Sequence, residues 1–478
     1  MDTTLRTLLD RRTTESIAST ETEEFHSGQW SNLPSLPLEK IYSFVSRDDQ
    51  LNMSLVCRKW SKGFGLPSVW KTFRFALTQS QLSMDTCPVM KFVRKYSSMF
   101  RHLEIHFLEN NFNEHLTRTW CRNLIEFLQM LTSNSQLISV KFEYLTWYRL
   151  STDTPTYHDI CRAICNFLGS QHHLKRVEFH QCSFDYQEGA EILKSLTENN
   201  RESLTYLVLS RFLPHMLENE ERDSIAVQHL PKLVNLPSLT TLEIDYQLIF
   251  GCIFARESTV IEISDIIESL KNFQCRILLK ITMSIFAVTK TNGFKRLTSE
   301  AWRFLKQLCP NLQVELLFST NSPSRRRVGF FVVKYMPITH LWYNFAVYSA
   351  NHPSVMEIDA LFYRLRACEI NDHLVFLCLV WVLPIPDLAS SCIPFLLACK
   401  KLKCLELFIV YPVNGIDVLM KSWIDNRPES LERVLLDISD IENEDNYNIC
   451  MNLTTEYLSR LEMVGLNVKV DLNFKRFQ

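Results

Sequence analysis

The stretch "LKRVEFHQC" at residues 174–182 contains a pattern that recurs along most of this chain. Its apolar residues Leu174, Val177 and Phe179 follow the template ΦxxΦxΦ, where Φ is apolar and x is any residue. Val177 and Phe179 alternate with polar residues, which is typical of a β-strand with one buried face. A single strand of this kind cannot bury its apolar face alone. The stretch therefore predicts one unit of a repeat.

The same template recurs along most of the chain, at first-position spacings of mostly 26–39 residues. The copies are Leu137-Val140-Phe142, Leu174-Val177-Phe179, Leu204-Leu207-Leu209, Leu239-Leu242-Ile244, Ile338-Leu341-Tyr343, Leu374-Leu377-Leu379, Leu402-Leu405-Leu407 and Leu431-Val434-Leu436. Weaker copies start near Leu103, Leu278 and Leu312. Segments with helical periodicity separate many of them, at 117–134, 156–171, 187–200, 298–310, 359–368 and 414–426. A strand followed by a helix, repeated with an irregular period, predicts an α/β solenoid with a mostly parallel sheet.

The segment 30–73 has a different pattern and predicts a small helical module. Leu38, Ile41, Tyr42 and Val45 recur at helical spacing and form one face. Asp48 or Asp49 is the expected N-cap of a second helix, which carries Leu51, Leu55, Val56 and Trp60 and ends at Gly63 or Gly65. "LPSVW" at 66–70 adds a short third element.

These residues resemble the F-box, on Leu33-Pro34, on "LVCRKW" at 55–60 and on the later Trp70. The second Leu-Pro, at 36–37, departs from the usual pattern. The resemblance implies a Skp-type adaptor as partner, joined to a cullin and a RING subunit. It also implies which residues face the adaptor; these are Leu33, Pro34, Leu38, Ile41, Tyr42, Val45, Val56 and Trp60. Of these, Val56 and Trp60 are expected to hold the second helix against the first.

The repeats resemble an irregular leucine-rich repeat array, in which Cys182 takes the place of the usual Asn or Cys. The whole arrangement resembles the F-box only proteins of metazoa. The expected domains are a disordered tail at 1–29, the F-box at 30–73, a linker at 74–86 and a curved substrate-binding solenoid at 87–478.

Residues between the template positions should point outward from the sheet and meet a target protein. The strongest candidates are Arg176, Glu178, His180, Tyr206, Glu243, Asp245, His340, Trp342 and Phe408, with Lys141, Glu143, Thr241 and Asn344 beside them. Charged and aromatic side chains in this mixture suit protein recognition, because Tyr, Trp and Arg serve as anchors. An ordinary solvated face is the alternative for each of them.

Composition argues against several other functions. The 51 Lys and Arg nearly balance 53 Asp and Glu, so nothing indicates nucleic-acid binding. The chain has only 10 glycines and no phosphate-binding or nucleophile-elbow motif. Its 15 cysteines form no CxxC pair, so we expect free thiols, no metal and no cofactor. No apolar run is long enough to span a membrane, and the expected location is cytoplasm or nucleus.

Three functions remain open at this stage. The first is the substrate-recognition subunit of an SCF-type ubiquitin ligase, with no catalytic residues of its own. The second is an F-box and repeat scaffold without a role in ubiquitination. The third, an α/β enzyme, is disfavoured by the scarcity of glycine and by the regular template.

A segment rich in acidic residues, 437–446, is expected to be an exposed loop.

Overall fold

The computed structural model describes residues 29–474 except 85–86, 108–112, 135, 146–153, 215–229, 255–259, 271–276, 288, 292–293, 321–324, 346–357, 384 and 386. The predicted tail therefore lies outside the described residues, apart from Gln29. The chain divides into two compact units. Unit 1 comprises residues 1–215 and 236–239, and unit 2 comprises residues 216–235 and 240–478.

Unit 1 begins with a helical module. Its elements are η2 (Gln29–Asn32), α2 (Ser35–Phe44), α3 (Arg47–Ser54), α4 (Arg58–Phe64) and α5 (Pro67–Trp70). The predicted second helix is wrong in detail, because α3 ends at Ser54 and a tight turn separates it from α4. Its cap is Ser46 rather than an aspartate, since the Ser46 Oγ accepts a hydrogen bond from the Asp49 N–H at 3.2 Å.

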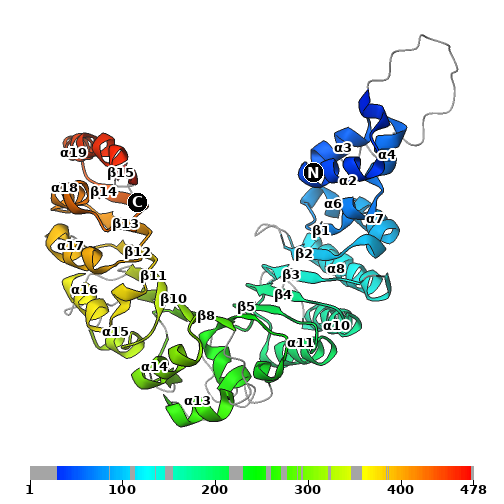
Figure 1. Ribbon diagram of the computed structural model, residues 1–478, viewed down its shortest axis with the longest axis horizontal. Helices are drawn as coiled ribbons and strands as arrows, with labels where there is room; N and C mark the ends of the chain where they lie inside the picture. The colour runs from blue at the N-terminus through cyan, green and yellow to red at the C-terminus, as the bar shows by residue number, and fades with distance from the viewer. Residues whose placement is uncertain are drawn as a thin grey trace. The chain divides into compact units, whose positions relative to one another are not determined.

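The rest of unit 1 alternates strands with helices (Figure 1). The elements are β1 (Thr72–Phe75), α6 (Gln79–Leu82), α7 (Pro88–Tyr96), η3 (Ser97–Met99), β2 (His102–His106), α8 (Glu114–Asn134), β3 (Ser139–Glu143), α10 (Thr154–Ser170), β4 (Arg176–His180), α11 (Tyr186–Asn199) and β5 (Tyr206–Ser210). The strands pair in parallel in chain order, from β1 to β5.

Unit 2 continues the same alternation. Its first half contains η4 (Leu233–Asn235), β6 (Thr241–Asp245), η5 (Tyr246–Leu248), η6 (Phe250–Phe254), β7 (Val260–Ile261), α13 (Ile263–Leu270), β8 (Leu278–Ile285), β9 (Arg296–Leu297), α14 (Ser299–Leu308) and β10 (Gln313–Thr320). Its second half contains α15 (Arg325–Phe331), β11 (Ile338–Phe345), α16 (Ile358–Ala367), η7 (Ile370–Asp372), β12 (Phe376–Trp381), α17 (Leu388–Ala398), β13 (Cys404–Val410), α18 (Ile416–Asn426), β14 (Arg433–Ile441), α19 (Glu444–Met463) and β15 (Asn467–Phe474). The main strands run in the order β6-β8-β10-β11-β12-β13-β14-β15, again in parallel, and β7 pairs with β9 beside them.

The predicted fold class, a helical module followed by a mostly parallel stack of strands and helices, is confirmed. Every residue of the strong template copies is at most 3% exposed. Parallel pairing places equivalent residues side by side; Val140, Val177 and Leu207 form one such row. In each unit the repeat helices lie along one face of the strands and leave the other face open (Figure 1). This open face is called the outward face below.

Two sequence predictions need correction. In two of the weaker copies the first template position lies three residues earlier than expected. Phe100 and Cys309, each 0% exposed, occupy that position, so Leu103 and Leu312 occupy the second apolar position. Leu278 points outward, and its neighbour Leu279 is buried instead. The segment 74–86, expected to be a linker, includes the end of β1 and all of α6. This stretch is largely polar, but its apolar residues are buried in the first repeat.

Trp70 joins the helical module to the first repeat. Its indole Nε1–H donates a hydrogen bond to the Phe64 carbonyl at 2.6 Å. Its ring lies 4.4 Å from that of Phe92 and 5.8 Å from that of Tyr96, both on α7. One buried side chain thus packs against both parts of unit 1.

We expect Trp70→Ala to loosen the helical module, because it removes a buried ring at this joint at a cost of about 3–5 kcal/mol. Trp70→Phe should cost less, since it keeps a ring and loses the hydrogen bond, worth about 1 kcal/mol. Hydrogen exchange of residues 30–72 measures the effect. Trp30→Ala is the control, since that side chain is 69% exposed; equal loss of protection in Trp30→Ala and Trp70→Ala would contradict the assigned joint.

Candidate functional site

The helical module exposes large apolar side chains on its surface. Leu36 and Phe44 of α2 are each 77% exposed, and Leu55 and Val56 in the turn after α3 are 57% and 62% exposed. An isolated exposed leucine is ordinary, but several on a module of this size indicate a protein-binding surface. We call these four residues the apolar surface of the module.

Several predicted adaptor-facing residues instead form the module's own core. Leu38 and Tyr42 are 2% and 0% exposed. The Tyr42 hydroxyl donates to the Trp60 carbonyl at 2.8 Å, and burial raises the pKa of Tyr42 to about 12. Helix α4 approaches α2 so closely that a Cβ on Gly63 would lie 2.9 Å from the Leu38 Cδ2. Leu38, Tyr42 and Gly63 therefore lie in the interior of the module and support the helices that carry its apolar surface.

The remaining predicted residues are more accessible. Pro34 is exposed, and Leu33, Ile41, Val45 and Trp60 are partly buried. The Trp60 Nε1–H donates to the Trp30 carbonyl at 3.0 Å. The expectation that Val56 holds two helices together is wrong, because its side chain is mostly exposed in the turn. The sequence predicted one helix through this turn, because Leu55 fits the helical spacing. The exposure of Leu55 was therefore not predicted.

The outward face of unit 1 carries opposite charges in adjacent positions. The Lys141 Nζ lies 2.7 Å from the Glu143 Oε1, and the His106 Nδ1 lies 3.1 Å from the Glu143 Oε2. Farther along, the Arg74 Nε lies 4.0 Å from the Glu104 Oε2. These side chains and the neighbouring trio around Glu178 form the charge ladder of unit 1. Its members partner one another, which leaves little unsatisfied charge for a ligand.

Glu178 is the most buried member of this ladder, at 9% exposed. Its carboxylate lies 2.5 Å from the Arg176 Nε and 2.9 Å from the His180 Nε2. Burial alone would raise the pKa of Glu178, but the hydrogen bonds from His180 and Arg176 outweigh it and lower that pKa to about 2. The Arg176 guanidinium also stacks 3.8 Å from the Tyr206 ring centroid. Sequence reasoning predicted all four residues as outward-facing, and the structure brings them together as one cluster.

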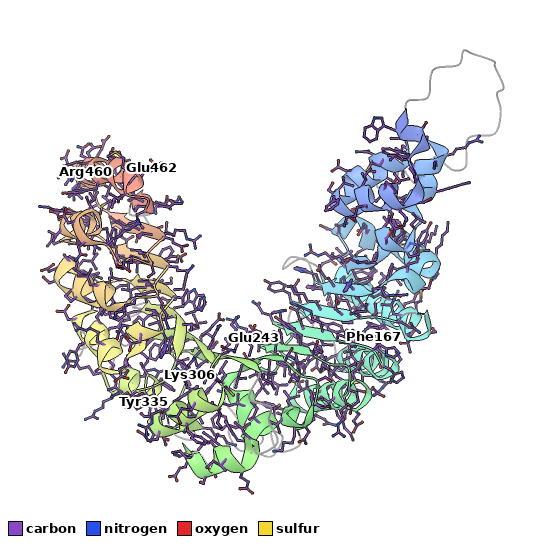
Figure 2. The ribbon with its side chains drawn as sticks, viewed as in Figure 1. Phe167, Glu243, Lys306, Tyr335, Arg460 and Glu462 are labelled. Atoms are coloured by element: carbon purple, nitrogen blue, oxygen red, sulfur yellow. The ribbon has the colours of Figure 1, made fainter. Side chains whose placement is uncertain are left out.

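In unit 2 the outward face begins with a second charged group. The Lys280 Nζ lies 3.2 Å from the Glu243 Oε1 and 3.0 Å from the Glu315 Oε1. Glu243 is labelled in Figure 2. The His340 Nδ1 lies 3.6 Å from that same Glu315 oxygen. Burial lowers the pKa of His340, although Glu315 opposes this effect. Asp245 of β6 pairs with Thr282 of β8, which in turn pairs with Glu315 of β10. Asp245 therefore lies in the same row across the sheet as Glu315.

Beside this group lie three aromatic rings, His340, Trp342 and Phe376, which we call the aromatic cluster. The Trp342 and Phe376 centroids are 4.9 Å apart, and the His340 centroid lies 5.8 Å from Trp342. The rings remain partly exposed, because they stand on the face of β11 and β12 opposite the buried template residues. Phe408, also predicted, stands on the same face of β13. Phe376 also occupies an x position of its repeat, so the same signal was present in the sequence, but it was not among the predicted candidates.

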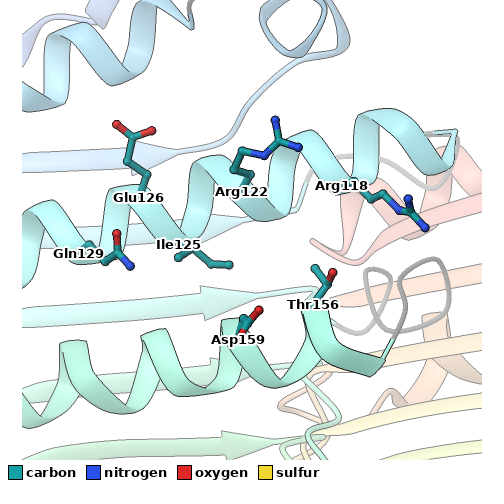
Figure 3. Close-up of a pocket in the computed structure, with 7 residues that line it drawn as sticks. All are labelled: Arg118, Arg122, Ile125, Glu126, Gln129, Thr156 and Asp159. Carbon is teal, nitrogen blue, oxygen red and sulfur yellow. The ribbon is translucent and has the colours of Figure 1, made fainter.

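Two other features do not form a ligand site. A groove of about 370 Å³ lies between α8 and α10 (Figure 3), but Arg118 and Asp159 in it already pair with Glu114 and Arg162. Among the described residues, no three His, Cys, Asp or Glu side chains gather to hold a metal ion. The fourteen cysteines in the described part of the chain form no disulfide with one another, and burial raises the pKa of thiols such as Cys252 and Cys378 to about 12. In the part of the chain that the structure describes, no helix has the length and apolarity to cross a membrane.

Glu178→Gln should destabilise unit 1 near neutral pH by about 1 kcal/mol, a value reduced by solvent near the surface. Because the pKa of Glu178 is lowered on folding, its contribution is complete above the ordinary pKa of 4.5 and is lost as the pH falls to about 2. The difference in unfolding free energy between wild type and variant should therefore shrink across that interval. Urea unfolding at several pH values measures it; a difference that stays constant contradicts the assignment. Glu202→Gln, at an 80% exposed side chain, is the control.

Comparison with known proteins identifies the helical module. Residues 30–72 match the F-box domain family. A stretch of 78 residues is 30% identical to the F-box/LRR-repeat protein 21 of Bos taurus, covering 16% of this chain and 18% of that protein. The chain thus matches about a fifth of the curated relative's length.

Two solved structures were also found similar, at low scores. One is described as PhdJ bound to substrate intermediate, with 7% identity and a TM-score of 0.20 over 53% of this chain and 67% of that one. The other is the crystal structure of a TLR13-ssRNA13 complex, with 12% identity and a TM-score of 0.23 over 86% and 66%. Residues 30–72 are an F-box domain, and a stack of parallel strands and helices follows it.

Proposed function

We propose that this chain is the substrate-recognition subunit of an SCF-type ubiquitin ligase. The observation that carries the proposal is the apolar surface, Leu36, Phe44, Leu55 and Val56, on a domain that matches the F-box family. F-box domains bind Skp-type adaptors, and the adaptor joins them to a cullin and a RING subunit. The F-box/LRR relative supports this assignment of class.

The energetics of the module favour a protein partner for this surface. Fully burying one leucine or phenylalanine side chain contributes about 1.5–3 kcal/mol. Four such side chains left exposed on one small domain therefore represent a large gain that only a second protein can supply. The neighbouring Arg58 and Lys59 are exposed cations, which contribute to the rim of an interface rather than to its centre.

For the target protein, we place the recognition surface at the aromatic cluster of unit 2. Ring side chains bury large areas at low entropic cost and are frequent anchors at interfaces. The charge ladder of unit 1, in contrast, is satisfied internally. Beside the cluster the two carboxylates of Glu243 and Glu315 share the single cation of Lys280. The negative charge left over favours a target that carries a cation next to an apolar side chain.

On this proposal the chain performs no chemistry itself. It holds a target lysine close to the ubiquitin-carrying enzyme, so that its contribution is one of proximity. A narrower kinship, with the type of F-box only protein thirty-nine, is proposed on "LVCRKW" at 55–60 and "EGAEILKSL" at 188–196.

Leu55→Ala with Val56→Ala should remove the adaptor and the cullin from a pull-down of the full chain. Two central apolar anchors typically cost about 2 kcal/mol or more when truncated, roughly thirty-fold in affinity. Neither side chain belongs to the core, so circular dichroism should show an unchanged fold.

Two control variants accompany this experiment. Arg58→Ala with Lys59→Ala should weaken binding by less than about 1 kcal/mol, since rim charges contribute little. Val418→Ala removes a 50% exposed apolar side chain from α18 and should have no effect. Loss of the adaptor in the cation variant, with retention in the Leu55 and Val56 variant, would refute the proposed surface.

Trp342→Ala with Phe376→Ala should retain the adaptor and lose the target. The comparison is quantitative mass spectrometry of proteins that co-purify with wild type and variant. Tyr363→Ala, an aromatic residue 76% exposed on α16 in the helical layer, is the matched control. A target that co-purifies equally with the cluster variant and wild type would place recognition elsewhere.

A further inference from the structure

The last strand, β15, forms an open edge of the unit 2 sheet. Among the described strands it pairs with β14 alone. In β14 the buried row Val434, Leu436 and Ile438 is 0% exposed, but the equivalent residues of β15 are partly exposed. An edge of eight residues without proline is a ready template for another strand.

The backbone direction along this edge can be read from one hydrogen bond. The Asn467 N–H donates to the Glu432 carbonyl, just before β14, at 3.1 Å. Successive residues of a strand direct their backbone groups to opposite sides. The N–H and C=O groups of Val468, Val470 and Leu472 therefore point to the open edge.

The sequence of this strand is complementary to itself when read in reverse. "NVKVDLN" at 467–473 is centred on Val470. In an antiparallel pair of two copies centred there, Val470 faces the partner's Val470, and Val468 faces the partner's Leu472. Lys469 faces the partner's Asp471, and Asn467 faces the partner's Asn473.

Backbone geometry and charge select the same register. Val468, Val470 and Leu472, whose backbone groups point to the open edge, all fall in hydrogen-bonded pairs, so that the open N–H and C=O groups of these three residues gain partners. Lys469 and Asp471 fall in the closer, non-hydrogen-bonded pair, with Cα atoms about 4.5 Å apart. A register centred on Lys469 or on Asp471 would instead place like charges opposite each other, which is destabilising.

We propose that β15 pairs antiparallel with β15 of a second copy of this chain, on a two-fold axis through Val470. The occupant is a second copy because the charge pattern is complementary to itself, as an isologous interface requires. The existing pair within one strand, Lys469 Nζ to Asp471 Oδ2 at 2.6 Å, has side chains 70% and 38% exposed. Both are therefore accessible to the partner. The inference does not depend on the proposed ligase function.

Charge exchange tests the pairing directly. The full chain should move from its 56.1 kDa mass toward twice that mass with rising concentration in sedimentation equilibrium. Lys469→Asp alone and Asp471→Lys alone each place like charges opposite each other and should remain monomeric. Mixed in equal amounts they should dimerise, because every opposing pair is then of opposite charge. The double exchange in one chain should also dimerise.

A backbone variant tests the hydrogen bonds. Val470→Pro removes an N–H that points to the open edge, so that the monomer keeps its fold and the dimer is lost. Lys403→Asp, which disrupts an exposed pair with Glu432 away from this edge, is the control and should still dimerise.

Three outcomes would overturn the proposal. The first is a wild-type chain that stays at the mass of one chain at every concentration. The second is a mixture of the two charge variants that fails to dimerise while both are folded by circular dichroism. The third is a dimer that Leu55→Ala with Val56→Ala abolishes, which would place the contact at the F-box domain instead.

Discussion

The parallel register between neighbouring strands places equivalent side chains of successive repeats in contact. A strand of five residues, such as β4, can bury its apolar side chains only against equivalent side chains in the next strands. Val140, Val177 and Leu207 meet in this way, and Phe142 stacks on Phe179 at 5.0 Å. The helices then cover this buried row, and each intervening side chain is directed outward. The spacing of apolar residues in the ΦxxΦxΦ template thus determines both which side chains form the core and which lie on the outward face.

The same register brings different side chains together on the outward faces of the two units. In unit 1 it brings basic and acidic side chains together, and their mutual hydrogen bonds outweigh the cost of burying a carboxylate such as Glu178. In unit 2 it brings Trp342 and Phe376 together, and rings do not satisfy one another in this way. Their exposed area stays available to a partner. An ion-paired face and an aromatic face can therefore arise from one repeat, depending only on which residues occupy the x positions.

The sequence predicted the stack and its strong strands, because periodicity reports burial directly. It failed where local chemistry overrides periodicity. Helix α17, which contains Pro394, was not among the predicted helical segments. The expected acidic loop at 437–446 is the end of β14 and the start of α19. The break between α3 and α4 was missed, since Leu55 fits the helical spacing and yet lies in a turn. Side-chain pairings across strands could not be predicted either, because they require the register of neighbours distant in sequence.

The first and last described strands of the stack face the same physical problem, since among the described strands each pairs with one neighbour alone. At the first strand, β1, the edge has only four residues, and the F-box domain is fixed beside it by Trp70 and its contacts with Phe92 and Tyr96. At β15 the edge has eight residues, and the side chains that continue the buried row of β14 are partly exposed. A short edge next to a packed domain gains little from a further strand, whereas a long edge with open backbone groups gains several hydrogen bonds. The tight joint at Trp70 also holds the F-box surface in a fixed position relative to the first repeats of unit 1.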